Sequence, residues 1–94
     1  MTILFTQRAF VPDDVMMRDV AGESVILNLN TETYFGLDEV GTRMWNSLQQ
    51  AGTIQEAYES LISEYDVDTA TLRNDFQNLI EDLVKHGLLA LDAT

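Results

Sequence analysis

The chain has 94 residues with 16 acidic and five basic side chains, and its formal net charge is -11. This length allows one hydrophobic core but not a deep, multi-part active site. Few and scattered positive side chains disfavour nucleic acid and anionic membranes as partners, because both bind through clustered Lys and Arg. The chain contains no cysteine, and its N-terminal apolar stretch is too short for a signal peptide, which favours a cytoplasmic protein.

The first part of the chain is predicted to be an arm followed by a β-meander. Residues 1–12 are apolar and end at Pro12, and they form either a docked arm or an additional short strand. Residues 13–38 contain three predicted strands, at 15–20, 24–29 and 33–37. The first two strands are joined by the hairpin signal Ala21-Gly22-Glu23.

Alternation along the strands predicts which side chains face the core. In the second strand the pattern places Val25, Leu27 and Leu29 toward the core. In the third strand it places Thr33, Phe35 and Leu37 on one face and Tyr34 and Gly36 on the other.

Residues 39–91 are predicted to form three helices and a short C-terminal tail. Asp38 is expected to cap the first helix, Thr53 and Glu56 form a capping box for the second, and Asp68 is expected to cap the third. Apolar residues recur at helical spacing in the first helix at Val40, Met44, Trp45 and Leu48. The third helix is predicted to end at Gly87 and carries the stripe Leu72, Phe76, Leu79, Ile80, Leu83 and Val84. The apolar tail 88–91 is expected to return to the core.

The predicted fold is α+β and winged helix-turn-helix-like, with a three-stranded antiparallel β-meander followed by a three-helix bundle. We expect residues 1–94 to form a single domain. The sequence contains no convincing catalytic, metal or cofactor motif. His86 is the only histidine and falls at a helix end, and the carboxylates do not match the spacing of a metal site. We therefore predict a protein that is not an enzyme and needs no cofactor.

The edge of the third strand is the most informative feature. Thr33 to Leu37 contain neither the lysine nor the proline that usually protects an exposed sheet edge. Such an edge can bind an extended peptide through backbone hydrogen bonds, with side-chain pockets giving specificity. The predicted binding wall consists of Thr33, Tyr34, Phe35, Gly36 and Leu37 from the strand and Arg73, Asp75, Phe76, Leu79, Ile80 and Leu83 from the third helix. Two alternatives remain, in which residues 1–12 cover the edge or two copies pair through it.

The ordered pattern "VILNL…TYFGLDEVGTRMWNSL…DFQNLIEDLVKHGLL" resembles the PqqD-like family, the recognition elements for precursors of ribosomally synthesised, modified peptides. Within that family it is most similar to the stand-alone leader-binding proteins of lasso-peptide biosynthesis. The matching positions are Leu27, Tyr34, Phe35, Leu37, Val40, Gly41, Trp45, Leu48, Thr53, Leu61, Tyr65, Val67, Asp75, Phe76, Leu79, Leu83, Gly87 and Leu88.

The resemblance implies a function. Family members bind the leader of a precursor peptide as a strand beside the third strand and against the third helix, and present it to modifying enzymes. The implied partners are the leader, a cysteine-protease-like leader peptidase and possibly an ATP-dependent cyclase, or in other subgroups a radical-SAM enzyme. Asp75 matches a recurrent acidic position, with either a leader contact or a helix-stabilising role. Alternatives are a scaffold subunit that reads no leader, an edge-paired dimer, and a winged-helix DNA-binding protein, which the charge disfavours.

Overall fold

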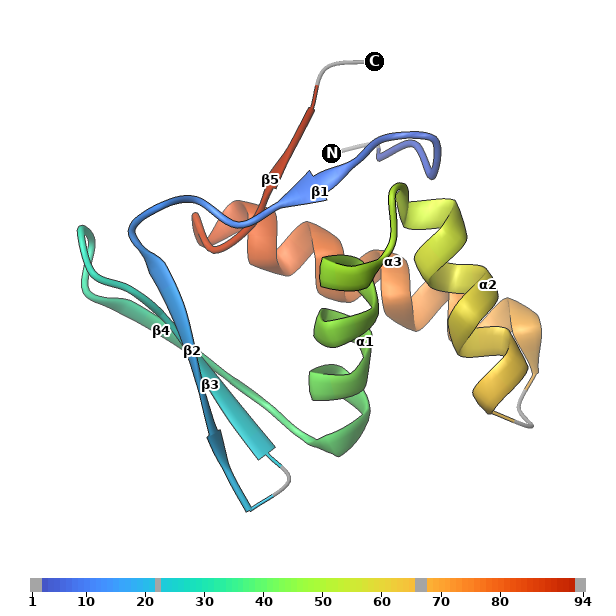
Figure 1. Cartoon of the computed structure of the whole chain (residues 1–94), viewed down its shortest axis with the longest axis horizontal. Helices are drawn as coiled ribbons and strands as arrows, with labels where there is room; N and C mark the ends of the chain where they lie inside the picture. The colour runs from blue at the N-terminus through green and yellow to red at the C-terminus, as the bar shows by residue number, and fades with distance from the viewer. Residues whose placement is uncertain (1–2, 22, 66–67, 93–94) are drawn as a thin grey trace.

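The computed structural model describes residues 3–21, 23–65 and 68–92, so Gly22 of the predicted hairpin turn, residues 1–2 of the arm and Val67 lie outside the described residues. The elements in chain order are β1 (Ala9–Phe10), β2 (Val15–Val20), β3 (Glu23–Asn28), β4 (Thr33–Leu37), α1 (Glu39–Gln50), α2 (Ile54–Glu64), α3 (Thr69–Lys85) and β5 (Ala90–Leu91). The α+β class, with a three-stranded antiparallel sheet followed by three helices, is therefore as predicted (Figure 1).

The three longer strands form a sheet in the order β2-β3-β4, with both pairs antiparallel. We call its two sides the inner face, which α1 covers, and the outer face. Cross-strand partners such as Ile26 and Phe35 share a face. The register therefore assigns each side chain of the sheet to one of its two faces. The inner face carries Val15, Met17, Asp19, Ser24, Ile26, Asn28, Thr33, Phe35 and Leu37, and the outer face carries Met16, Arg18, Val20, Glu23, Val25, Leu27, Tyr34 and Gly36.

The predicted orientation of β3 is wrong, whereas that of β4 is confirmed. Ile26 is fully buried between the polar residues Ser24 and Asn28, while Val25 points outward and Leu29, just beyond the strand, is exposed. The two polar residues tolerate burial because each has a hydrogen-bond partner. The hydroxyl groups of Ser24 and Thr42 of α1 lie 2.7 Å apart. Hydrophobic alternation could not reveal these partners, since they come from distant parts of the chain.

Asn28 fixes the position of α3 relative to the sheet. Its side-chain amide donates to the carbonyl oxygen of Gly87 at 2.9 Å, and its side-chain oxygen accepts from the backbone N–H groups of Asn30 and Thr31. Gly87 has a φ of 72°, and the N–H groups of Gly87 and Leu88 bond back to the carbonyls of Val84 and Leu83. This is a Schellman motif, which ends α3 as the sequence predicts.

The helix starts also agree with prediction, except that the Glu56 carboxylate accepts from the hydroxyl rather than from the backbone N–H of Thr53. The side chains of Asp38, Thr53 and Asp68 accept from backbone N–H groups in the first turns of α1, α2 and α3. The apolar face of α1 differs from the prediction at one residue: Val40 is exposed rather than part of the core. Its neighbour Gly41 is buried instead. A Cβ at Gly41 would lie 3.2 Å from Cδ2 of Leu37, so the missing side chain allows α1 to approach β4 closely.

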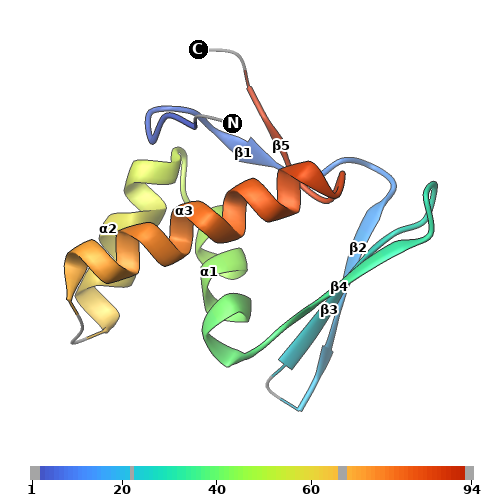
Figure 2. The same cartoon turned by 180° about the vertical axis from the view of Figure 1, so that it is seen from behind.

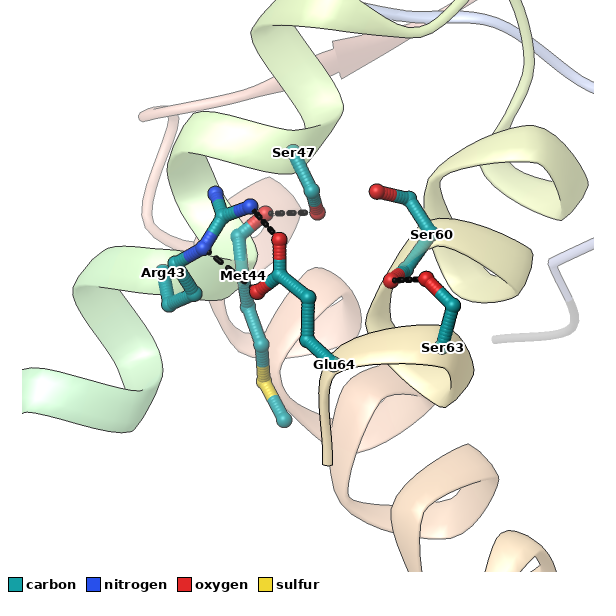
Figure 3. A network of polar contacts seen from close by, with 6 residues as sticks. All are labelled: Arg43, Met44, Ser47, Ser60, Ser63 and Glu64. Carbon is teal, nitrogen blue, oxygen red and sulfur yellow. Dashed lines mark hydrogen bonds and ion pairs between the residues drawn. The ribbon is translucent and has the colours of Figure 1, made fainter. Parts of the chain in front are cut away.

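An ion pair links α1 to α2 on the surface (Figure 3). The Arg43 guanidinium donates to both carboxylate oxygens of Glu64, and this hydrogen bonding raises the pKa of Arg43. Both side chains are about one-third exposed, at 31% and 37%, so the pair contributes little to stability. The core beneath, which includes Trp45, Ile54 and Leu61, holds these two helices together.

Residues 3–12 form both a docked arm and a short strand. Ile3 and Phe5 are buried, and the Phe5 ring makes edge-to-face contacts with Tyr58 and Phe76 at centroid distances of 5.6 and 6.2 Å. The following β1 pairs with β5 in a separate two-stranded sheet. Figure 1 shows this ribbon at the opposite end of the molecule from the β2–β3 hairpin. The strand of the described arm therefore pairs with β5 and not with β4.

Candidate functional site

One edge of β4 lacks a strand partner in the described residues. The sheet order places β3 on one side of β4 and no strand on the other. In an antiparallel sheet, alternate residues of such a strand direct their N–H and C=O groups away from the neighbour. Thr33 to Leu37 thus offer backbone donors and acceptors to an added strand, with no lysine or proline to prevent pairing.

The side chains of β4 differ in what they offer to such a strand. Phe35 and Thr33 are partly exposed on the inner side, whereas Tyr34 and Gly36 lie on the outer face. Tyr34 is 73% exposed. Leu37 is buried in the core, so its side chain offers no contact to an added strand.

One side of α3 contacts β4 through His86 at the helix end, and we call this side of the helix the α3 flank. It comprises Asp75, Leu79, Asp82 and His86, which recur at intervals of four, three and four and therefore share one face of the helix. The His86 ring meets the Phe35 ring edge-to-face at a centroid distance of 5.6 Å, and this contact identifies the side that faces the strand. In Figure 2, α3 runs across the front, and β4 begins beyond the C-terminal end of α3 and runs below it to the start of α1.

The structure places four of the predicted binding residues on α3 away from the β4 edge. Phe76, Ile80 and Leu83 are 0% exposed, because they form the stripe that packs against the arm and the other helices. Arg73 lies on the opposite side of the helix from the α3 flank, with its guanidinium 3.8 Å from the centroid of the Phe5 ring. None of these four side chains is available beside β4. Leu79, which is partly buried, and Asp75, which is exposed, remain candidates.

His86 lies near the edge but was absent from the predicted wall. His86 caps the end of α3, and its Nδ1 lies 2.7 Å from the carbonyl oxygen of Asp82. The helical interval of Asp75, Leu79, Asp82 and His86 was visible in the sequence. Only the Phe35–His86 contact, however, shows which side of α3 turns toward the strand.

A hollow of about 420 Å³ lies at the end of β4 near the β2–β3 hairpin, lined by Val20, Glu23, Ser24, Val25, Gly36, Leu37 and Asp38. Gly36 contributes to its openness, since a Cβ there would meet no atom within 4 Å. Its carboxylates belong to Glu23 and Asp38. Within residues 3–21, 23–65 and 68–92, no three acidic or histidine side chains cluster as metal ligands, and no helix is long and apolar enough to cross a membrane.

The chain belongs to the PqqD family. The family described as "Coenzyme PQQ synthesis protein D (PqqD)" matches residues 23–89, which run from β3 to the residue before β5. A solved structure described as "TbiB1 in Complex with the TbiA(beta) Leader Peptide" is similar, with a TM-score of 0.79 and 34% sequence identity. The match covers 89% of this chain and 98% of that chain. No curated protein matches the chain significantly.

Proposed function

We propose that this chain binds the leader segment of a ribosomally made precursor peptide as an added strand along β4. The observation that carries the proposal is the unpaired β4 edge beside the α3 flank. The similar solved chain, TbiB1, was captured with a leader peptide, which supports the same class of ligand. The chain acts by binding rather than by catalysis.

The geometry gives each part of the site a role. Backbone groups of Thr33 to Leu37 hydrogen-bond the leader and supply affinity that does not depend on its sequence. Leader side chains on the inner side meet Phe35 and Leu79, which favours apolar or aromatic anchors there. Asp75 and Asp82 flank Leu79 on α3, and they favour a leader without acidic residues on that side.

The partners that receive the bound peptide are, in our proposal, the enzymes of a lasso-peptide pathway. These are a cysteine-protease-like leader peptidase and an ATP-dependent cyclase. The whole chain works as one domain, with residues 13–38 supplying the binding edge and residues 39–91 the supporting helices. A second candidate is a peptide chaperone for a radical-SAM enzyme, which the family match favours. Purified enzymes of both kinds, mixed in turn with the leader-bound protein, distinguish these two pathways.

Leader binding is tested by fluorescence polarisation with labelled leaders from small open reading frames beside this gene. We expect saturable binding of one leader, competed by the unlabelled peptide but not by a scrambled peptide of the same composition. Absence of binding to any neighbouring leader, from protein shown to be folded and monomeric, would reject the proposal in favour of a scaffold role without leader reading.

Strand addition itself is tested with leaders that carry one N-methyl group on successive backbone amides. An added strand directs only every second N–H group toward β4, so we expect affinity losses that alternate along the binding segment. Losses that cluster without alternation, or follow side chains alone, would show that the leader binds in another conformation.

Two alanine variants on α3 locate the inner side of the site. Leu79 and Val84 are both partly buried apolar residues packed against the core, but they lie on opposite sides of the helix. We expect Leu79→Ala to weaken leader binding about tenfold or more, as for an anchor in an interface, and Val84→Ala to leave it unchanged. Equal effects of the two variants would show that stability, rather than contact, controls binding.

A further inference from the structure

The hollow at the end of β4 lies directly beside the proposed leader site. It is centred on Gly36, which the register pairs with Val25 of β3 on the outer face of the sheet. In Figure 1 this is the lower end of the sheet, where β4 leads into α1. A Cβ at Gly36 would meet no atom within 4 Å, so no part of the described fold fills this space.

An added strand brings one of its own side chains to this hollow. Residues opposite each other on neighbouring strands share a face, so the leader residue opposite Gly36 directs its side chain to the outer face. Large side chains cover a glycine on the neighbouring strand in this way. Strands lie about 4.8 Å apart. A side chain must therefore be long to cross β4 above Gly36 and reach Val25.

The lining of the hollow combines apolar surface with two carboxylates. Val20 and Val25 supply the apolar part, and both side chains are exposed. Glu23 and Asp38 supply the carboxylates, on exposed residues at the two ends of the hollow's lining segments. The Asp38 carboxylate accepts from the N–H of Gly41 at 2.8 Å, which holds it in place at the start of α1.

Within residues 3–21, 23–65 and 68–92, no basic side chain pairs with these two carboxylates. These ranges include all five basic residues of the chain, and the ion pair they form is that of Arg43 with Glu64. Arg18 shares the outer face but is not among the residues that line the hollow. A positive group that enters the hollow is therefore attracted by both carboxylates and displaces no internal partner.

We infer that the hollow over Gly36 is a subsite for one lysine or arginine side chain of the leader. The aliphatic stem lies over Gly36 against Val20 and Val25, and the charged end remains near water beside Glu23 and Asp38. This inference rests on the proposed leader binding and adds a sequence requirement, namely a basic leader residue opposite Gly36. An acidic residue at that position would be repelled, and a short one would leave the hollow unfilled.

The test is a double-mutant cycle between the protein and the leader that binds in fluorescence polarisation, with each leader residue replaced in turn by alanine. In the protein, Gly36→Val fills the hollow. This variant should fold, because its Cβ meets no atom and valine suits a strand. Glu23→Gln removes one carboxylate from the lining. Glu32→Gln is the matched control, since it removes the same charge from an exposed residue in the turn at the other end of β3.

With the unmodified leader, we expect Gly36→Val to weaken binding about tenfold, because the aliphatic stem loses its burial. Glu23→Gln should weaken binding about threefold, as for an ion pair near the surface, and Glu32→Gln should leave it unchanged. One basic leader residue should couple to both positions. Once it is replaced by alanine, the Gly36→Val and Glu23→Gln proteins should bind that leader as tightly as the wild-type protein does.

Four results would overturn the inference while leaving leader binding intact. These are equal effects of Glu23→Gln and Glu32→Gln, coupling of Gly36 to an aromatic or aliphatic leader residue, a bound leader without lysine or arginine, and unchanged affinity of a Gly36→Val protein with a native circular dichroism spectrum. If Gly36→Val fails to fold, the comparison of Glu23→Gln with Glu32→Gln decides. Absence of leader binding by the wild-type protein would instead refute the proposed function.

Discussion

Replacement of Asn28 by alanine tests whether this side chain fixes α3 against the sheet. The substitution removes three hydrogen bonds, one to the Gly87 carbonyl and two from the N–H groups of Asn30 and Thr31. A net contribution of about 1 kcal/mol per bond gives about 3 kcal/mol in total. The three backbone partners belong to exposed residues, so water can replace part of the lost hydrogen bonding. We therefore expect the free energy of unfolding to fall by about 2 kcal/mol.

The measurement is the free energy of unfolding from urea titration, with circular dichroism and tryptophan fluorescence as two independent probes. Asn30→Ala is the matched control, because Asn30 is exposed and its backbone rather than its side chain makes the bond to Asn28. We expect this control to change stability by less than about 0.5 kcal/mol. An equally small effect of Asn28→Ala would refute the view that its buried amide connects β3 to the end of α3.

Two further substitutions address α3. Gly87→Ala should cost about 1 kcal/mol in urea unfolding, because its φ of 72° is unfavourable for a residue with a Cβ; an unchanged midpoint would show that the helix end relaxes freely. Asp75→Asn should weaken leader binding in fluorescence polarisation but change the free energy of unfolding by less than about 0.5 kcal/mol, because the described residues give its side chain no hydrogen bond or ion pair. A stability loss with unchanged leader affinity would assign Asp75 to the helix rather than to the site.

The elements that sequence reasoning predicted correctly depend on local chemistry. The caps Asp38, Thr53 and Asp68 act on backbone groups two or three residues away. A short stretch of sequence is therefore enough to predict each cap. The faces of β4 follow from simple alternation and are as predicted. Gly87 ends α3 through its own backbone conformation, which also requires no distant information.

The errors arise where a distant partner decides the orientation. Ser24 and Asn28 face inward because Thr42 and Gly87 supply their hydrogen bonds, and β3 consequently turns Val25 outward. Along α3, Phe76 and Leu79 are equally apolar in sequence, and only packing distinguishes the buried residue from the one beside β4. Arg73 points away from β4 because Phe5, at the other end of the chain, docks beneath its guanidinium.

The β1–β5 ribbon has a consequence for the order of folding. It joins the ends of the described chain: Gln7 donates to the carbonyl oxygen of Asp92, 85 positions later, and the Asp92 carboxylate accepts from the N–H of Arg8. Closing so long a loop costs more entropy than closing the hairpins of the meander, whose strands are neighbours in sequence. We expect the meander to form early and the ribbon to close last. On the ribosome, the binding edge would then be assembled before residues 90–92 emerge, and the ribbon would attach the arm to the helices only after that.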